Sequence, residues 1–490
     1  PLSAAAAATD AWLRRVGRRS ADTEKTPSPL TERVQQIDAE LFVGQLATAR
    51  RLIEQTPAAE RDDPRVRLRE GQLEFRAGRV DQAARVFDAL LARRPPIEAN
   101  VRAQVLMGQG AVEIRRQHWV AAQAHYTQAL ELLERTSAGA DNPALLGNAY
   151  NGRGVSQVLQ GKMEGAVRDM GMARIAMQRS GDFVEAATVA SNLGKIETLR
   201  RHDAQALQEF DRAIAVFERF DVRDYLAATW MSKAETQLSM VQPADAAASV
   251  ERAHALAKSV EDAYLIESIG MARSRVLLAN GRLREAEESI RALHVKADDG
   301  DDASVQELRL LLLLARGDRA GAATLAQRVP GATVTLKGAQ ALAAVQAALR
   351  NRDVATARAW VARIPATVPP DDSRTAWEVA RALLVQAEGD TAGALQIARE
   401  ATARTEQAGS PEERVEAGLL QARLLLALGQ RDAAAAVLGD LDAFAASDYR
   451  VAWTTLSLYR ALGDAGMTAT ALQRVQALRG ERDAAVEPAL

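Results

Sequence analysis

The stretch REGQLEFRAGRVDQAARVFDALLARRP, residues 69–95, contains the pattern that decides the fold. It holds a small residue, Gly71, then Gly78, and then Ala83 five positions later, followed by the large Phe87. Glycine readily adopts the positive φ that ends a helix, so Gly78 marks a turn between two helices. The small Gly71 and Ala83 allow the two helices to approach, and Phe87 fills the space beside them. The stretch therefore predicts a helical hairpin.

The same register recurs along the chain at intervals of 34 to 44 residues. That period is typical of helical hairpins stacked in an array. The small residue of the second helix falls at Ala49, Ala83, Ala122, Ala166, Ala206, Ala246, Ala286, Ala322, Ala357, Ala394, Ala434 and Ala471. A glycine precedes this alanine by five at Gly44, Gly78, Gly161, Gly281, Gly317, Gly389 and Gly429. A bulky residue follows it by four at Phe87, Tyr126, Met170, Phe210 and Ile290.

Length and composition agree with an array. The 490 residues exceed what one compact core holds, and only 4% are aromatic. The net charge of −2 lacks the strong positive field that nucleic-acid binding needs, so we expect no direct nucleic-acid binding by this chain. Absence of cysteine excludes disulfides and thiolate metal sites. No apolar run is long enough for a membrane span.

These positions resemble the tetratricopeptide repeat family over residues 30–480, with Trp230 where the family pattern has its tryptophan. The resemblance implies an all-α, right-handed superhelical solenoid of about twelve helix-turn-helix repeats. We expect five segments. They are an N-terminal helix and linker at 1–30, repeats one to seven at 31–296, an acidic loop at 297–304, degenerate repeats eight to twelve at 305–480, and a frayed tail at 481–490.

The family also implies a ligand surface, because the first helix of each repeat lines a concave groove that binds extended peptides or helices. The groove positions are Arg76, Arg115, Asn148, Asn151, Ser191, Asn192, Lys195, Glu235 and Arg275. Among them Asn148, Asn151, Asn192 and Lys195 have the chemistry to hold a peptide backbone or a carboxylate. Hydrogen bonding between repeats and plain solvation remain alternatives for these side chains.

Motifs of catalysis are missing from the sequence. It contains no HExxH, no GxSxG and no complete phosphate-binding loop, and its five histidines are scattered along the chain. We therefore expect a non-enzyme with no catalytic residues, no metal ligands and no cofactor. The Ala-rich helix faces of repeats eight to twelve are candidates for a homodimer surface.

One narrower resemblance concerns function. Residues 33–55, RVQQIDAELFVGQLATARRLIEQ, and the long Ala- and Arg-rich array are similar to the C-terminal repeat region of bacterial winged-helix transcription regulators. This resemblance implies a sensing domain that binds a protein or peptide. The chain opens with Pro1, so we expect a processed or excised piece that meets a membrane only through a missing upstream segment. The domain would be periplasmic in a membrane-anchored regulator and cytoplasmic otherwise. The alternative is a free-standing adaptor for envelope, secretion or pilus assembly.

Overall fold

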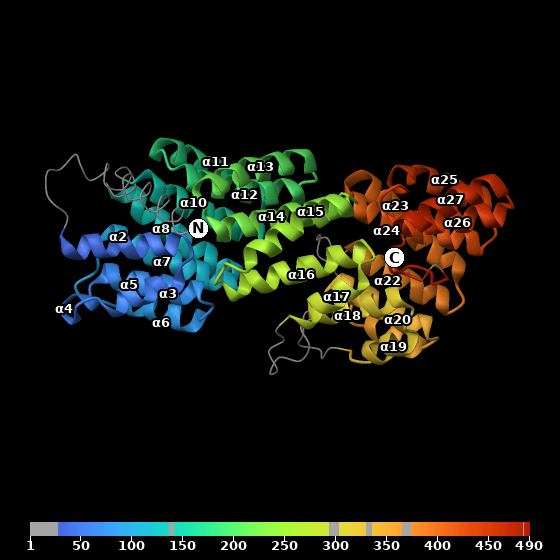
Figure 1. The fold of residues 1–490 in the computed structure, drawn as a ribbon, viewed down its shortest axis with the longest axis horizontal. Helices are drawn as coiled ribbons and strands as arrows, with labels where there is room; N and C mark the ends of the chain where they lie inside the picture. The colour runs from blue at the N-terminus through green and yellow to red at the C-terminus, as the bar shows by residue number, and fades with distance from the viewer. Residues whose placement is uncertain (1–27, 137–141, 294–302, 330–335, 365–373, 484) are drawn as a thin grey trace. The chain divides into compact units, whose positions relative to one another are not determined.

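The computed structural model describes residues 28–136, 142–293, 303–329, 336–364, 374–483 and 485–490. Over these residues the structure is all-helical and forms twelve helical hairpins (Figure 1). The first helices are α2 (Pro29–Phe42), α5 (Pro64–Arg76), α7 (Ala99–Arg115), α10 (Pro143–Val158), α12 (Phe183–Leu199), α14 (Arg223–Ser239), α16 (Ala263–Ala279), α18 (Ala303–Arg316), α20 (Gly338–Arg350), α22 (Arg374–Ala387), α24 (Pro411–Ala427) and α26 (Tyr449–Leu462).

The second helices each carry one of the alanines of the repeat pattern. They are α3 (Leu46–Glu54), α6 (Val80–Leu91), α8 (Trp119–Arg135), α11 (Met163–Ser180), α13 (Asp203–Phe220), α15 (Pro243–Ala257), α17 (Leu283–Arg291), α19 (Arg319–Ala326), α21 (Val354–Val361), α23 (Thr391–Ala408), α25 (Arg431–Asp440) and α27 (Ala465–Leu478). Two short helices, α4 (Ala58–Arg61) and η1 (Asp442–Phe444), lie between hairpins in the sequence.

The repeat register predicted from the sequence is confirmed. Eleven of the twelve alanines are fully buried, and Ala471 is 3% exposed. All seven predicted turn glycines have positive φ, between 69° and 101°. Gln117, Arg201, Val241 and Arg352 replace the turn glycine in four other hairpins and adopt φ near 60°. In the last hairpin the turn falls at Gly463, so Ala471 is buried through a shifted register.

The chain divides into two compact units. Unit 1 comprises residues 1–232 and 252–266, and unit 2 comprises residues 233–251 and 267–490. Within unit 1 each first helix contacts the next first helix, from α2 through α12, and within unit 2 the same holds from α18 through α26. Consecutive second helices do not approach to the same extent. The first helices therefore line the inner side of the array in each unit.

Unit 2 has a large continuous core in which alanine dominates the central first helix. On α20, five alanines are at most 2% exposed, at positions Ala341, Ala343, Ala344, Ala347 and Ala348. They belong to the same hydrophobic cluster as Trp360 and Trp377. Small side chains on opposite sides of one helix let neighbouring helices pack closely on both sides. These alanines of α20 are thus part of the core.

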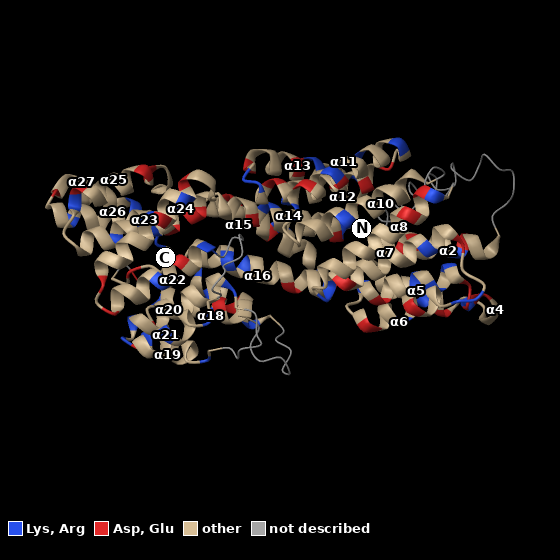
Figure 2. Ribbon diagram, turned by 180° about the vertical axis from the view of Figure 1, so that it is seen from behind, with Lys and Arg blue, Asp and Glu red and all other residues tan. Residues whose placement is uncertain are grey.

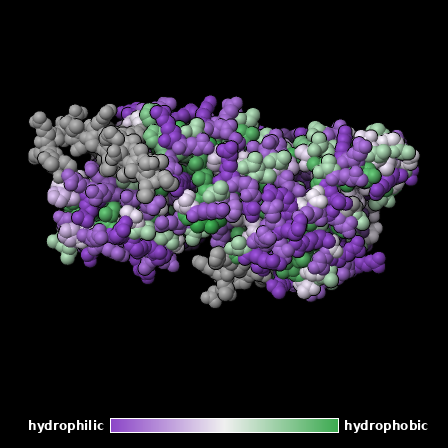
Figure 3. Space-filling model, in the orientation of Figure 1, coloured by the Kyte–Doolittle hydropathy of each residue, from purple (hydrophilic) through white to green (hydrophobic). Residues whose placement is uncertain are grey.

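Charges of both signs are interspersed along the helices of both units (Figure 2). Hydrophilic residues cover much of the face in Figure 3, with apolar residues scattered among them. No described helix combines the length and apolarity that crossing a bilayer requires. The predicted N-terminal helix and most of the acidic loop at 297–304 lie outside the described residues.

Candidate binding surfaces

Two asparagines of the predicted groove meet on the inner helices of unit 1. Asn151 lies on α10 and Asn192 on α12, and the Asn192 Nδ2 donates to the Asn151 Oδ1 at 2.9 Å. Both side chains are partly exposed, and this is their one side-chain hydrogen bond among the described residues. Both N–H groups of Asn151, and the Oδ1 and second N–H of Asn192, take no part in this bond.

The neighbouring predicted residues differ in accessibility. Asn148, one turn before Asn151 on α10, is partly exposed, and Lys195 on α12 is exposed. Ser191 is only 7% exposed, and its hydroxyl lies 3.0 Å from that of Thr229 on α14. Ser191 therefore joins two inner helices, which is the inter-repeat role that the sequence left open. The accessible polar surface consists of Asn148, Asn151, Asn192 and Lys195, and we call it the amide patch.

Two predicted groove arginines are engaged within unit 1 by late repeats. Arg76, the last residue of α5, forms an ion pair with Asp224 at the start of α14. Arg115, the last residue of α7, pairs with Asp262 at 3.2 Å and lies over the Tyr264 ring at 4.0 Å. These arginines hold early and late repeats of unit 1 together, and we call the two ion pairs the closure pairs.

Burial dominates the electrostatics of Asp224. The residue is 8% exposed. Desolvation raises the pKa of its carboxyl despite the opposing effect of Arg76. Asp262 and Glu261 add further negative potential that raises this pKa. Gly44 packs directly against the same carboxylate, where a Cβ would lie 2.7 Å from its Oδ1. The carboxylate is therefore enclosed by the α2–α3 turn and by Arg76.

Unit 2 contains a cavity of about 250 Å³ on its inner side. The predicted groove residue Arg275 on α16 lines this cavity and pairs with the buried Glu307 of α18 at 3.3 Å. Glu235 on α14 is exposed and is absent from the lining. Residues that share the cavity wall come from α14, the start of α15, α16, α18, α24, α26 with the two residues before it, and the segment after α27.

A charged cluster forms one wall of the cavity. Arg450 on α26 bonds the carboxylates of Asp448 at 2.6 Å and Glu412 at 2.8 Å. The Asp448 carboxylate also accepts from the backbone N–H groups of Arg450 and Val451, so it caps α26. Burial raises the pKa of Glu412, and burial together with the neighbouring Glu412 raises the pKa of Glu416 to about 8. Glu416 lies one turn after Glu412 on α24, outside the cavity lining, and its raised pKa places its titration near neutral pH.

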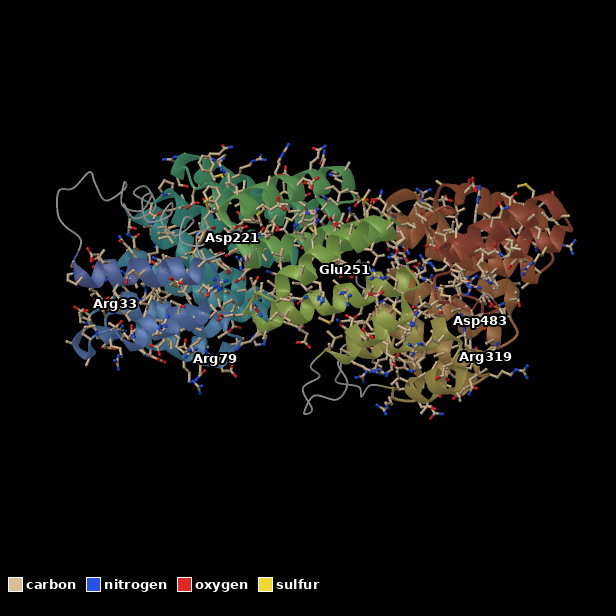
Figure 4. The ribbon with its side chains drawn as sticks, in the orientation of Figure 1. Arg33, Arg79, Asp221, Glu251, Arg319 and Asp483 are labelled. Atoms are coloured by element: carbon tan, nitrogen blue, oxygen red, sulfur yellow. The ribbon has the colours of Figure 1, made fainter. Side chains whose placement is uncertain are left out.

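Residues 481–483 and 485–490 lie against the inner helices of unit 2, whereas the sequence predicts a frayed tail. Asp483, labelled in Figure 4, belongs to this segment. The Arg482 guanidinium donates to the carbonyls of Leu278 at 2.5 Å and Ala279 at 2.7 Å. These carbonyls end α16, where a cation is favourable. The segment has no helical periodicity of its own, and contacts with distant helices order it.

Side chains of unit 2 bind the backbone of this segment. Arg350 donates to the Glu487 carbonyl at 2.7 Å, and Arg423 donates to the Pro488 carbonyl at 3.1 Å. The Gln346 Oε1 accepts from the Leu490 N–H at 3.3 Å. Pro488 is buried, and Ala489 and Leu490 pack against the main core. We call the surface formed by the cavity and these contacts the unit 2 groove.

Sequence reasoning missed most of the unit 2 groove. Arg423 stands inside the apolar run LLQARLLLA at 419–427, and a charge within such a run was the available signal. Desolvation lowers the pKa of Arg423 to about 10. Arg350 gave no such signal, because a basic residue at a helix end is common.

No group of three or more His, Asp or Glu side chains in the described part of the chain is arranged to hold a metal ion. Comparison with protein-family models and with curated proteins finds no match. Solved structures with a similar helical-repeat fold include a Rap protein complexed with competence and sporulation factor. It is 12% identical, with a TM-score of 0.48, covering 82% of this chain and 98% of that one.

Two more distant likenesses also concern the fold. The apo form of the quorum sensor NprR from B. thuringiensis is 9% identical, with a TM-score of 0.45, covering 79% of this chain and 99% of that one. The APC/C hetero-tetramer Cut9–Hcn1 is 12% identical, with a TM-score of 0.39, covering 92% of this chain and 87% of that one.

Proposed function

We propose that this chain is a non-catalytic binding array and forms the sensing or regulatory part of a bacterial signalling protein or transcription regulator. Its ligand is a protein or an extended peptide that lies along the inner helices. The observation that supports this most directly is the Asn151–Asn192 pair, 2.9 Å apart on consecutive inner helices. Outside this bond the pair keeps the N–H donors of Asn151 and the Oδ1 acceptor of Asn192, which match the carbonyl and N–H of a peptide backbone.

A peptide-display selection against the full chain tests the binding role of the amide patch. Selected peptides should bind the native chain and lose about tenfold in affinity when Asn151→Ala and Asn192→Ala are combined, since two hydrogen bonds contribute roughly 1.4 kcal/mol. Asn100→Ala, an exposed asparagine at the start of α7, is the matched control and should have no effect. Selected peptides that bind the double variant unchanged would refute a role for the amide patch.

The regulatory role is tested by the state of the protein in its source cells. Immunoblotting of fractionated cells should detect a membrane-bound band well above 52.7 kDa, because a regulator has an effector domain on the same chain. A soluble band near 52.7 kDa would instead support a free-standing adaptor.

A further inference from the structure

The unit 2 groove contacts residues 486–490 in the way that a peptide-binding groove contacts its ligand. Arg350 and Arg423 donate to consecutive carbonyls, of Glu487 and Pro488, and Gln346 accepts from the Leu490 N–H. These contacts bind the backbone of a segment without regular secondary structure, and the side chains of Ala489 and Leu490 pack against the apolar core. Main-chain hydrogen bonds combined with side-chain pockets are the usual means of binding an extended peptide.

Selectivity would come from the side chains of the occupant. The Glu487 carboxylate lies 3.1 Å from the Arg423 guanidinium, so the groove favours an acidic residue at that point. Pro488 follows in a buried position, and its ring fixes φ at a value compatible with extended backbone. Val486 packs against Gly317, where a Cβ would lie 2.8 Å from its Cγ2. The pattern read by the groove is aliphatic, acidic, proline, then small and aliphatic.

The groove has more hydrogen-bonding capacity than residues 486–490 use. Among the described residues, the Tyr449 hydroxyl, the Gln346 Nε2 and the Arg423 Nη2 are buried without a hydrogen-bond partner. Tyr449 and Gln346 are 4% and 7% exposed. Buried polar groups left unpaired are costly, so an occupant that supplied acceptors to them would bind more tightly. The cavity of about 250 Å³ beside Val486 also leaves room for a larger side chain.

We propose that the unit 2 groove is a second peptide-binding site, occupied within the chain by residues 486–490, and that an external acidic and proline-containing peptide displaces this segment. The proposal rests on the proposed binding function but concerns a site separate from the amide patch. The internal segment competes at a high effective concentration, of order millimolar for a short connection. A ligand must therefore satisfy more of the groove than the segment does.

The test uses the full chain and a fluorescent peptide, ERDAAVEPAL-amide, which copies residues 481–490. Fluorescence anisotropy compares native chain with Pro488→Asp, which places a charge at a buried position of the segment and weakens its hold. The peptide should bind the variant at least tenfold more tightly than the native chain. Adding Arg423→Gln should remove that gain, while Arg431→Gln, at the exposed start of α25, should leave it. A peptide with Lys in place of its second Glu, which copies Glu487, is the sequence control.

A spin label reports the segment directly, because the chain has no cysteine and Ala485→Cys would be its one labelling site. Ala485 is exposed, so the label should be tolerated. We expect restricted label motion in the otherwise native chain and fast motion after excess peptide is added. Fast motion before addition would overturn occupancy of the groove by the segment. Restricted motion that persists in saturating peptide, or no peptide binding by a Pro488→Asp chain of native helicity, would overturn displacement.

If Pro488→Asp loses helicity, the spin label in the otherwise native chain decides alone. Failure here leaves the proposed function intact if displayed peptides still depend on Asn151 and Asn192. If displayed peptides do not depend on Asn151 and Asn192 while the peptide still displaces residues 486–490, the amide patch is refuted as a binding site and the unit 2 groove is supported.

Discussion

At the scale of single residues, two glycines inside helices show why the repeat pattern is restrictive. A Cβ on Gly194 would lie 2.6 Å from the Phe210 ring of the paired helix, so there is no space for it. Gly171, in the middle of α11, has no neighbour within 4 Å of the same hypothetical atom. Both positions are glycines inside helices, but the first is crowded by a neighbouring side chain and the second has open space around it.

These environments predict opposite effects of alanine. Gly194→Ala should lower the free energy of unfolding by about 1–3 kcal/mol through overpacking against Phe210. Gly171→Ala should raise it by up to about 1 kcal/mol, since alanine is the better helix former. Urea denaturation followed by circular dichroism measures both. Equal effects of the two substitutions would mean that contact with the paired helix is not the reason for a small residue on the first helix.

Glu416 gives a pH dependence at the same scale. Burial and the neighbouring Glu412 raise its pKa to about 8, above the 4.5 expected when unfolded. Between these values the native state keeps a proton that the unfolded state releases, so Glu416 makes stability fall as pH rises, by up to about 1.4 kcal/mol per pH unit. Below 4.5 both states are protonated, and above 8 both are ionised, so the effect is flat outside this window.

Glu416→Gln removes this titration while keeping the shape of the side chain. The stability of the variant relative to the native chain should therefore increase from pH 5 to pH 8 and then level off. Denaturation midpoints at several pH values give the comparison. A constant difference across that range would show that Glu416 is ionised in the native state.

At the scale of elements, the closure pairs join helices that are far apart in the sequence. The Asp224 carboxylate is buried and has Arg76 as its ionic partner. Removing the arginine alone leaves a buried charge uncompensated, which costs about 3 kcal/mol. Arg76→Ala should therefore destabilise unit 1 strongly, and Arg76→Ala with Asp224→Ala should recover much of the loss. A double variant as unstable as the sum of the two single variants would mean that the residues act independently.

The same elements show what the sequence could and could not predict. Each turn glycine and buried alanine acts within one hairpin, so spacing alone located the pairs, as at Gly78 and Ala83. The pairing of Arg76 with Asp224 depends on how far each repeat is rotated relative to the next, added over several repeats. No local sequence pattern predicts that total rotation. Residues 486–490 have no periodicity, and they are held by Arg350, Arg423 and Gln346 on distant helices. The sequence therefore predicts that Arg275 lies on a groove, but it does not predict that residues 486–490 occupy the unit 2 groove.

At the scale of the whole molecule, a repeat array couples each hairpin mainly to its neighbours. Trp360 on α21 is fully buried, and its indole N–H donates to the Ala326 carbonyl of α19 at 2.7 Å. It lies in the large core cluster of unit 2. A perturbation at this position should therefore spread through the adjacent hairpins before it reaches distant ones.

Trp360→Ala should cost about 3–5 kcal/mol because it leaves a large cavity. Hydrogen–deuterium exchange should accelerate most in α19, α20 and α22, and it should be unchanged in α5 to α8. Trp360→Phe, which keeps most of the volume and loses the hydrogen bond, should give the same pattern at roughly 1–2 kcal/mol. Acceleration that is uniform across all twelve hairpins would mean that the array unfolds as one cooperative body. In that case occupation of the unit 2 groove would stabilise the amide patch as well, since any ligand of the native state would then stabilise every hairpin equally.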